Sequence, residues 1–176
     1  MSFKFESIER FVVGTVGMPG EREFFLQLRS QTELRSFKLE KGQAAALAER
    51  MREIIREVKR RYGLGYGPFK PDDGPLEMPV ESEFAIGSMS LTWDEEDSML
   101  LFSATEIPED AALEVTNQEE VGDLATVEAK LTLEEAAEFA RRTIKVVEAG
   151  RRPCTFCGSP LDPSGHLCPR ANGYRR

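Results

Sequence analysis

Histidine is almost missing from this chain: His166 is the only one among 176 residues, accompanied by three cysteines and one tryptophan. No apolar run approaches the roughly 20 residues that a membrane-spanning helix needs. The opening residues alternate charged and aromatic side chains and lack the apolar core of a signal peptide. These absences exclude histidine triads and multi-histidine metal sites from the first 150 residues. They also predict a cytoplasmic protein without a membrane partner.

Negative charge dominates the chain but is unevenly distributed. The composition, 40% hydrophobic and 31% charged with a net charge of −8, is typical of a soluble globular protein. Residues 151–176 carry five arginines against one carboxylate, a formal charge of +4, so residues 1–150 carry −12. The acidic part repels the phosphates of nucleic acids, whereas the basic tail can bind RNA or pair with acidic groups of the body. We favour the second role, because a dedicated nucleic-acid domain is usually basic overall.

Hydrophobic periodicity predicts six strands and two helices. The strands are expected at residues 11–16, 25–28, 34–39, 84–93, 99–105 and 124–131. Between the first two, the sequence Met18-Pro19-Gly20-Glu21 fits a type II turn, so these strands form a hairpin. Helical stripes cover residues 47–62, ending at Gly63, and residues 133–147, ending near Gly150, with a capping box at Thr132 and Glu135.

The order of these elements, three strands and a helix given twice (βββα-βββα), predicts an α+β fold. We expect a mainly antiparallel sheet with two helices packed on one face. Residues 1–150 form the body and residues 151–176 a separate tail in this interpretation. Both halves of the body should share one core, because each apolar stripe needs a partner surface. Residues 63–79 are rich in glycine and proline, so we expect a surface connection with little packing.

The tail contains the residue types that bind metals. Cys154 and Cys157 are spaced so that one tight turn presents both sulfurs to the same ion, and Gly158 allows a sharp turn after them. His166 and Cys168 add an imidazole and a third thiol, giving C-x2-C-x8-H-x-C. Three cysteines and one histidine are a recurrent ligand set for structural zinc, and this set uses every cysteine and the only histidine. The sequence therefore predicts zinc as the cofactor of a zinc-ribbon-like element.

Two other interpretations of the cysteines remain. A redox-active Cys-x-x-Cys pair requires a strand-to-helix context, whereas here Pro153 and Pro160 bracket a loop. A tail of unliganded cysteines is the third interpretation. The fourth ligand also stays open, because the step from His166 to Cys168 is shorter than the spacing of a second Cys-x-x-Cys. A water, Asp162 or a neighbouring chain can take the place of His166.

The stretch CTFCGSPLDPSGHLCPRANGYRR, together with VGTVGMPGEREFFLQLRS near the N-terminus, resembles a family of bacterial domains of unknown function. That family is known mainly from Actinobacteria and Chloroflexi. The resemblance covers nearly the whole chain and supports a metal site at the matching positions Cys154, Cys157, His166 and Cys168. It implies no activity that could be transferred to this chain.

Two functional classes are compatible with these residues. The first is a non-catalytic interaction protein whose structural zinc presents Arg170, Arg175 and Arg176 to a protein partner, to another copy or to RNA. The second is a hydrolase or transferase acting on a phosphorylated or other anionic substrate held by Arg22. The second class lacks an identifiable nucleophile and base, and zinc with four protein ligands has no open position for a catalytic water. Whether the protein is an enzyme stays open at this point.

Overall fold

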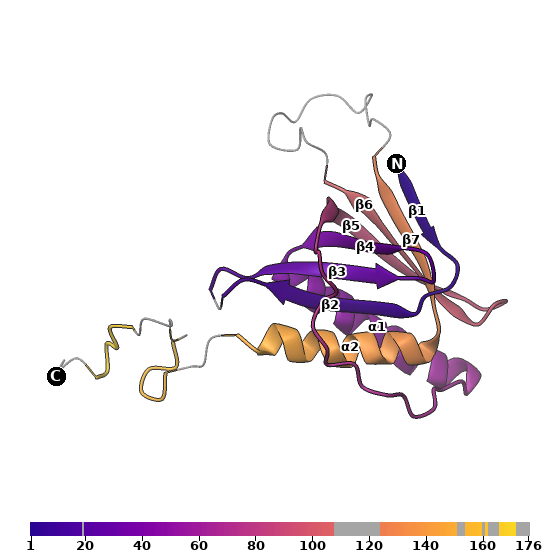
Figure 1. Cartoon of the computed structure of the whole chain (residues 1–176). Coiled ribbons are helices and arrows are strands. Elements are labelled where there is room, and N and C mark those ends of the chain that lie inside the picture. Colours follow the sequence, from indigo (N-terminus) through magenta and orange to yellow (C-terminus); the bar gives the residue numbers. More distant parts are fainter. Residues whose placement is uncertain (19, 108–123, 151–153, 160, 162–165, 172–176) are drawn as a thin grey trace, which may run out of the picture.

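The computed structural model describes residues 1–18, 20–107, 124–150, 154–159, 161 and 166–171. Its described elements are seven strands and two helices (Figure 1). In chain order they are β1 (Ser2–Phe5), β2 (Arg10–Val16), β3 (Glu23–Arg29), β4 (Leu34–Leu39), α1 (Lys41–Tyr62), β5 (Ser82–Asp94), β6 (Met99–Glu106), β7 (Thr126–Leu131) and α2 (Leu133–Glu148). The predicted α+β class is confirmed.

All seven strands belong to one sheet, in the order β1-β7-β6-β5-β4-β3-β2. Most neighbours are antiparallel, and the predicted hairpin is β2 and β3. Its turn has the geometry expected, because the Glu21 N–H donates to the Met18 carbonyl at 2.9 Å and Gly20 has a φ of 106°. The two halves of the chain meet where β4 and β5 pair in parallel, and α1 with the connection after it supplies the long link that such a pair needs.

Strand β1 was not among the predicted strands, so four strands rather than three precede α1. It pairs in parallel with β7, the last strand of the chain. Phe3 and Phe5 are buried and Lys4 is exposed, which is the alternation of a strand with one face in the core. Four residues beside a chain terminus are too few for this pattern to stand out, and the partner of β1 lies more than 120 residues away in the sequence.

Both helices lie on the same side of the sheet, as predicted (Figure 1). One core cluster contains buried side chains from all seven strands and both helices, so the two halves share a core. The predicted capping box is present: the Glu135 N–H donates to the Thr132 hydroxyl, and the Thr132 N–H donates to the Glu135 carboxylate. Helix α1 begins at Lys41, before the predicted stripe, and ends at Gly63 as expected. Neither helix of the described chain has the combination of length and apolar character needed to cross a bilayer.

The connection between α1 and β5 has one buried apolar anchor. Leu76 is buried against Val12 and Phe25, in a small second cluster apart from the main core. Gly14 makes room for it, since a Cβ at this position would lie 2.4 Å from Leu76 Cγ. The predicted surface connection is confirmed, because most of residues 63–79 are exposed. Leu76 is the exception: glycine and proline remove the periodic signal, but a single leucine can still bury its side chain.

A buried arginine also holds this connection in place. Arg142 of α2 is 4% exposed. Its guanidinium donates to the carbonyls of Val13 at 3.0 Å and Gly74 at 2.7 Å, and also to the carbonyl of Asp72. Desolvation by burial lowers the pKa of Arg142, and the Asp72 carboxylate opposes that shift. The arginine thus joins the helix, the edge strand β2 and the connection.

Candidate metal centre

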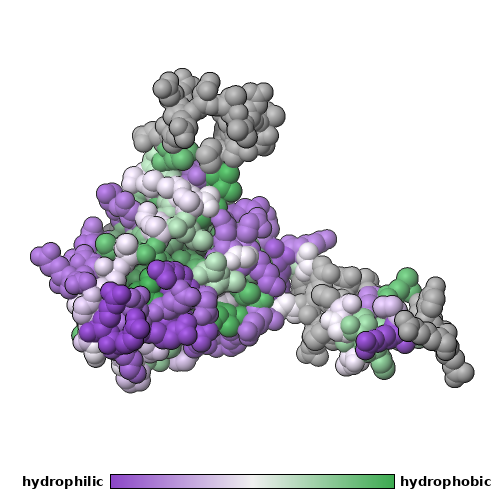
Figure 2. All heavy atoms as spheres, turned by 180° about the vertical axis from the view of Figure 1, so that it is seen from behind, coloured by the Kyte–Doolittle hydropathy of each residue, from purple (hydrophilic) through white to green (hydrophobic). Residues whose placement is uncertain are grey.

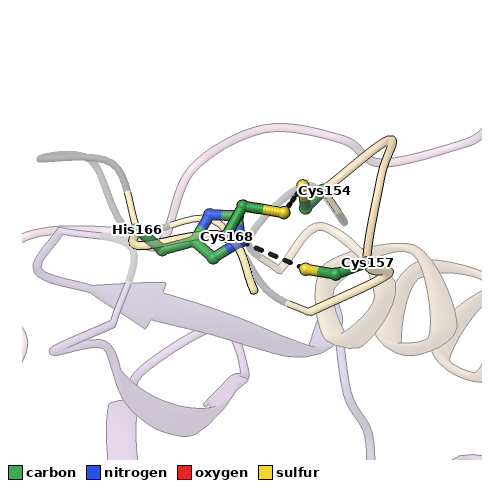
Figure 3. A group of neighbouring side chains, drawn as sticks. All are labelled: Cys154, Cys157, His166 and Cys168. Carbon is green, nitrogen blue, oxygen red and sulfur yellow. Dashed lines mark hydrogen bonds between the residues drawn. The ribbon is translucent and has the colours of Figure 1, made fainter. Parts of the chain in front are cut away.

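Three thiols and one imidazole converge in the C-terminal part of the chain. The ligand atoms of Cys154, Cys157, His166 and Cys168 all lie within 4.8 Å of one another, a group that can hold a metal ion. Figure 3 shows the four side chains pointing toward one another. Cys154 Sγ lies 3.7 Å from Cys168 Sγ, and Cys157 Sγ lies 3.2 Å from His166 Nε2. Residues up to 14 positions apart in the sequence are thereby brought to one point.

The first cysteine pair is shaped by a local turn. The Gly158 N–H donates to the Cys154 carbonyl at 2.9 Å, and the Cys154 N–H donates to the Ser159 carbonyl at 2.8 Å. Gly158 has a φ of 75°, a left-handed conformation that glycine adopts without strain. The Phe156 N–H points at Cys154 Sγ at 3.4 Å, so a backbone donor supports that sulfur. The turn presents both sulfurs toward the same side, as predicted from the spacing.

Two separations within the cluster can be compared with the geometry of a tetrahedral metal site. Zinc–sulfur bonds of about 2.3 Å in a tetrahedron place two sulfurs about 3.8 Å apart, and a sulfur and a nitrogen about 3.6 Å apart. The observed separations of 3.7 Å for the sulfur pair and 3.2 Å for sulfur and nitrogen differ from these values by a few tenths of an ångström. The remaining separations are at most 4.8 Å, so movements of up to about 1 Å would bring all four atoms to the tetrahedral spacing.

The electrostatic environment of the cysteines is uneven. The pKa of Cys157 is lowered to about 6, first by a hydrogen bond from the Ser159 side chain, then by the Ser159 backbone and by His166. Burial raises the pKa of Cys168. The thiolate is the form that binds metals. With a pKa of about 6, Cys157 is already mostly a thiolate at neutral pH.

The ring of His166, the candidate for the fourth ligand, lies beside the sulfurs. Its Nε2 atom faces Cys157, so the ring is oriented for coordination through that nitrogen. Asp162, the carboxylate considered in its place, lies outside the described residues. The arrangement favours four ligands from one chain.

Of the four arginines considered as anion or partner contacts, the structure describes Arg22 and Arg170. Arg22 donates to the carbonyl of Ala149 at 2.8 Å, at the C-terminal end of α2. Arg170 donates to the carbonyl of Phe156 at 3.2 Å rather than to a carboxylate of the described body. Arg175 and Arg176 lie outside the described residues. The role of Arg22 was not expected, since pairing of a hairpin residue with the end of a distant helix leaves no local signal.

Sequence reasoning also missed two apolar residues beside the candidate ligands. Phe156 is 64% exposed and Leu167 is 84% exposed. Each lies between two candidate ligands in the sequence, so its place beside the cluster could have been predicted from the spacing of the cysteines and the histidine.

The family model described as "Protein of unknown function (DUF3090)" matches residues 3–168. The chain belongs to this family. The DUF3090 match extends from β1 through the last of the four metal-site candidates, so it includes both the sheet and the cysteine and histidine cluster. No curated protein and no solved structure matches the chain. Membership in a family of unknown function, expected from the resemblance, is confirmed.

Proposed function

We propose that this protein is a zinc-binding, non-catalytic interaction protein, with one structural zinc ion held by Cys154, Cys157, His166 and Cys168. The observation that carries the proposal is the convergence of these four donors within 4.8 Å. Thiolates disfavour magnesium and calcium, and a mixed set of sulfur and imidazole donors is typical of zinc. Zinc would shape a C-terminal element over residues 151–176, attached to a body formed by residues 1–150. We place the protein in the cytoplasm, where thiols stay reduced and available for the metal.

A structural role follows from the number of protein ligands. Catalytic zinc sites usually have three protein ligands and a water in the fourth position, whereas structural sites are closed by four. With four donors from the protein, no position is left for a water that could be activated. The zinc would then act by fixing the shape of a short segment, which buries too little apolar surface to fold by itself.

The partner of such an element is a protein, including another copy of this chain. The exposed Phe156 and Leu167 support a protein surface, because both side chains are apolar and Leu167 offers no ring on which a base could stack. Nothing in the described residues favours the alternative, a hydrolase or transferase acting on an anionic substrate. Arg22, which that alternative requires, is engaged with the carbonyl of Ala149.

The first experiment is metal analysis of the full chain expressed in zinc-replete medium. We expect about one zinc per chain and X-ray absorption distances of about 2.3 Å to sulfur and 2.0–2.1 Å to nitrogen. Cys157→Ser and His166→Ala should each lower the zinc content, whereas Leu167→Ser, a change between two ligands, should leave it intact. A chain without metal would contradict the proposal. Three protein ligands with a bound water would instead support the enzyme.

A further inference from the structure

The described part of the C-terminal element has little besides the candidate ligands to hold its shape. Residues 154–159, 161 and 166–171 contain no helix or strand, and three backbone hydrogen bonds join them to one another. Cys154 and Cys168 are the buried side chains among them, with exposed fractions of 7% and 8%. Figure 2 shows hydrophobic and hydrophilic residues side by side on the surface of this small element. Its conformation therefore depends on the cluster, so a chemical change of the sulfurs becomes a change of shape.

The four candidate ligands form two pairs, as Figure 3 shows. Cys154 Sγ lies 3.7 Å from Cys168 Sγ, so these two sulfur atoms are in van der Waals contact. Cys157 Sγ instead faces His166 Nε2 at 3.2 Å. The sulfur–sulfur bond of a disulfide is about 2.05 Å long, so Cys154 and Cys168 need to approach by about 1.7 Å to form one. These two cysteines are therefore placed for a bond between their sulfurs.

A bond between these two sulfurs is incompatible with a closed zinc site. It would use two of the four donors and leave Cys157 and His166 as the remaining pair. Structural zinc needs four protein ligands in a tetrahedron, and the sulfur that binds a metal is the thiolate. The reduced chain would thus hold the metal, whereas a chain with this disulfide would release it.

We propose that the zinc site is an oxidation-sensitive switch, in which a peroxide joins Cys154 to Cys168 and the metal is released. The inference rests on the proposed function, because it describes how the binding of that zinc is regulated. Phe156 and Leu167, which are exposed and lie between candidate ligands in the sequence, would lose the positions that the metal fixes. A protein partner would therefore bind the reduced, zinc-containing element and not the oxidised one.

The reaction is a two-electron oxidation of two thiolates by hydrogen peroxide. The thiolate of one cysteine attacks the peroxide: a sulfur–oxygen bond forms, the oxygen–oxygen bond breaks, and the second oxygen leaves as hydroxide. The thiolate of the other cysteine then attacks the sulfur of this sulfenic acid, the disulfide bond forms, and the oxygen leaves as a second hydroxide. Both hydroxides take up a proton from the solvent, so the peroxide is reduced to two molecules of water. Zinc leaves as the divalent ion.

The accessibility of the cysteines and the reversibility of the bond are consistent with a switch. Cys154 and Cys168 are each partly accessible, so the pair is not sealed from a molecule as small as hydrogen peroxide. Disulfides in the cytoplasm are usually transient and catalytic or redox-sensing. A small thiol would open the bond by exchange and be oxidised to its own disulfide, which restores both thiol ligands.

The test uses the zinc-loaded full chain, freed of reductant and treated with about one to ten molar equivalents of hydrogen peroxide. A chromogenic chelator measures the released zinc, and peptide mapping without reduction locates the disulfide. Cleavage before Asp162 separates the peptide with the Cys-x-x-Cys pair from the peptide that contains Cys168. We expect about one zinc released for each disulfide, a bond between Cys154 and Cys168, and Cys157 free for alkylation. Excess thiol together with zinc should restore the metal content.

Matched variants test which sulfurs pair. Cys157→Ser and Cys154→Ser each retain two cysteines, one of which is Cys168. In excess zinc, Cys157→Ser should form its disulfide as fast as the original chain, because both sulfurs of the pair remain. Cys154→Ser should form one roughly tenfold more slowly, because its two sulfurs are not placed for the bond. Leu167→Ser, which leaves all four candidate ligands in place, should behave as the original chain.

Amide spectra show whether oxidation changes the surface of the element. In ¹H–¹⁵N correlation spectra, the signals of Phe156 and Leu167 should shift after peroxide treatment, whereas the signal of Trp93 in the body should not. Unchanged signals at Phe156 and Leu167 would overturn the switch.

Failure of the switch and failure of the zinc site give different results. A chain that contains zinc and keeps it through ten equivalents of peroxide overturns the switch while the zinc proposal stands. A disulfide that includes Cys157 in the original chain overturns the proposed pairing and with it the switch. A chain that never contains zinc overturns the proposed function itself.

Discussion

Replacing Arg142 by methionine tests whether the buried guanidinium holds the connection to the sheet. The arginine is 4% exposed and donates to the carbonyls of Val13, Asp72 and Gly74. Methionine fills a similar volume with apolar atoms but offers no donor. The change therefore removes the hydrogen bonds while it leaves most of the packing intact.

The expected cost can be estimated from the partners that remain. The Gly74 carbonyl keeps a bond from Arg10 at 3.3 Å, and the Asp72 carboxylate keeps its ion pair with Arg10. The carbonyls of Val13 and Asp72 lose their arginine donor, at about 1–3 kcal/mol for each buried group. Relief from burying a charge offsets part of this cost. We expect a net loss of about 3 kcal/mol, a large share of the roughly 5–15 kcal/mol that stabilises a typical domain.

Urea unfolding followed by the fluorescence of Trp93, the only tryptophan, measures this loss. The matched control is Arg141→Met, at a side chain that is 32% exposed and pairs with Glu138 and Asp73. Exposed ion pairs contribute about 0–1 kcal/mol, so this control should change stability little. Arg142→Lys should be intermediate, because lysine keeps the charge but loses the planar fork. If the two methionine variants were equally stable, the reasoning about Arg142 would be refuted.

Three further predictions concern the metal, acid stability and the packing at β2. Cys157→Ser should lower zinc content by elemental analysis yet leave the far-ultraviolet circular dichroism of the body unchanged, because among the described residues the main core includes none beyond α2. Hydrogen-bonded ion pairs with Lys145 and Arg141 lower the pKa of Asp73 to about 2 from an ordinary value of 3.8. The ionised Asp73 therefore stabilises the folded state fully at pH values above 3.8, and this stabilisation is lost as the pH falls toward about 2. Asp73→Asn should therefore make urea stability fall less steeply over this range, and equal slopes for the two proteins would contradict the assignment. Gly14→Ala should destabilise by about 1–3 kcal/mol, because its Cβ would meet Leu76 Cγ at 2.4 Å. A second change, Leu76→Ala, should remove most of that penalty in a double-mutant cycle, and additive effects would argue against the clash.

Local patterns determined most of the secondary structure. The turn at Gly20, the capping box at Thr132 and the helix end at Gly63 each depend on interactions within four residues, so their signals are complete in a short stretch of sequence. The same holds for the turn that carries Cys154 and Cys157. The metal-binding residue types and their spacing could therefore be predicted without a structure.

The tertiary structure decided which distant segments meet. Strand β1 pairs with β7, and the two halves join through β4 and β5. The hydrophobic periodicity of a strand does not show which distant strand it pairs with, so these pairings could not be predicted from the sequence. The same limit applies to Arg22 at the end of α2 and to Arg142 beneath the connection. An arginine in a helix reads as exposed from sequence, because only the assembled fold supplies enough carbonyls to compensate for burying its charge. The sequence by itself thus determined the candidate ligands and the local elements, while the closure of the sheet and the burial of Arg142 came from packing between distant parts of the chain.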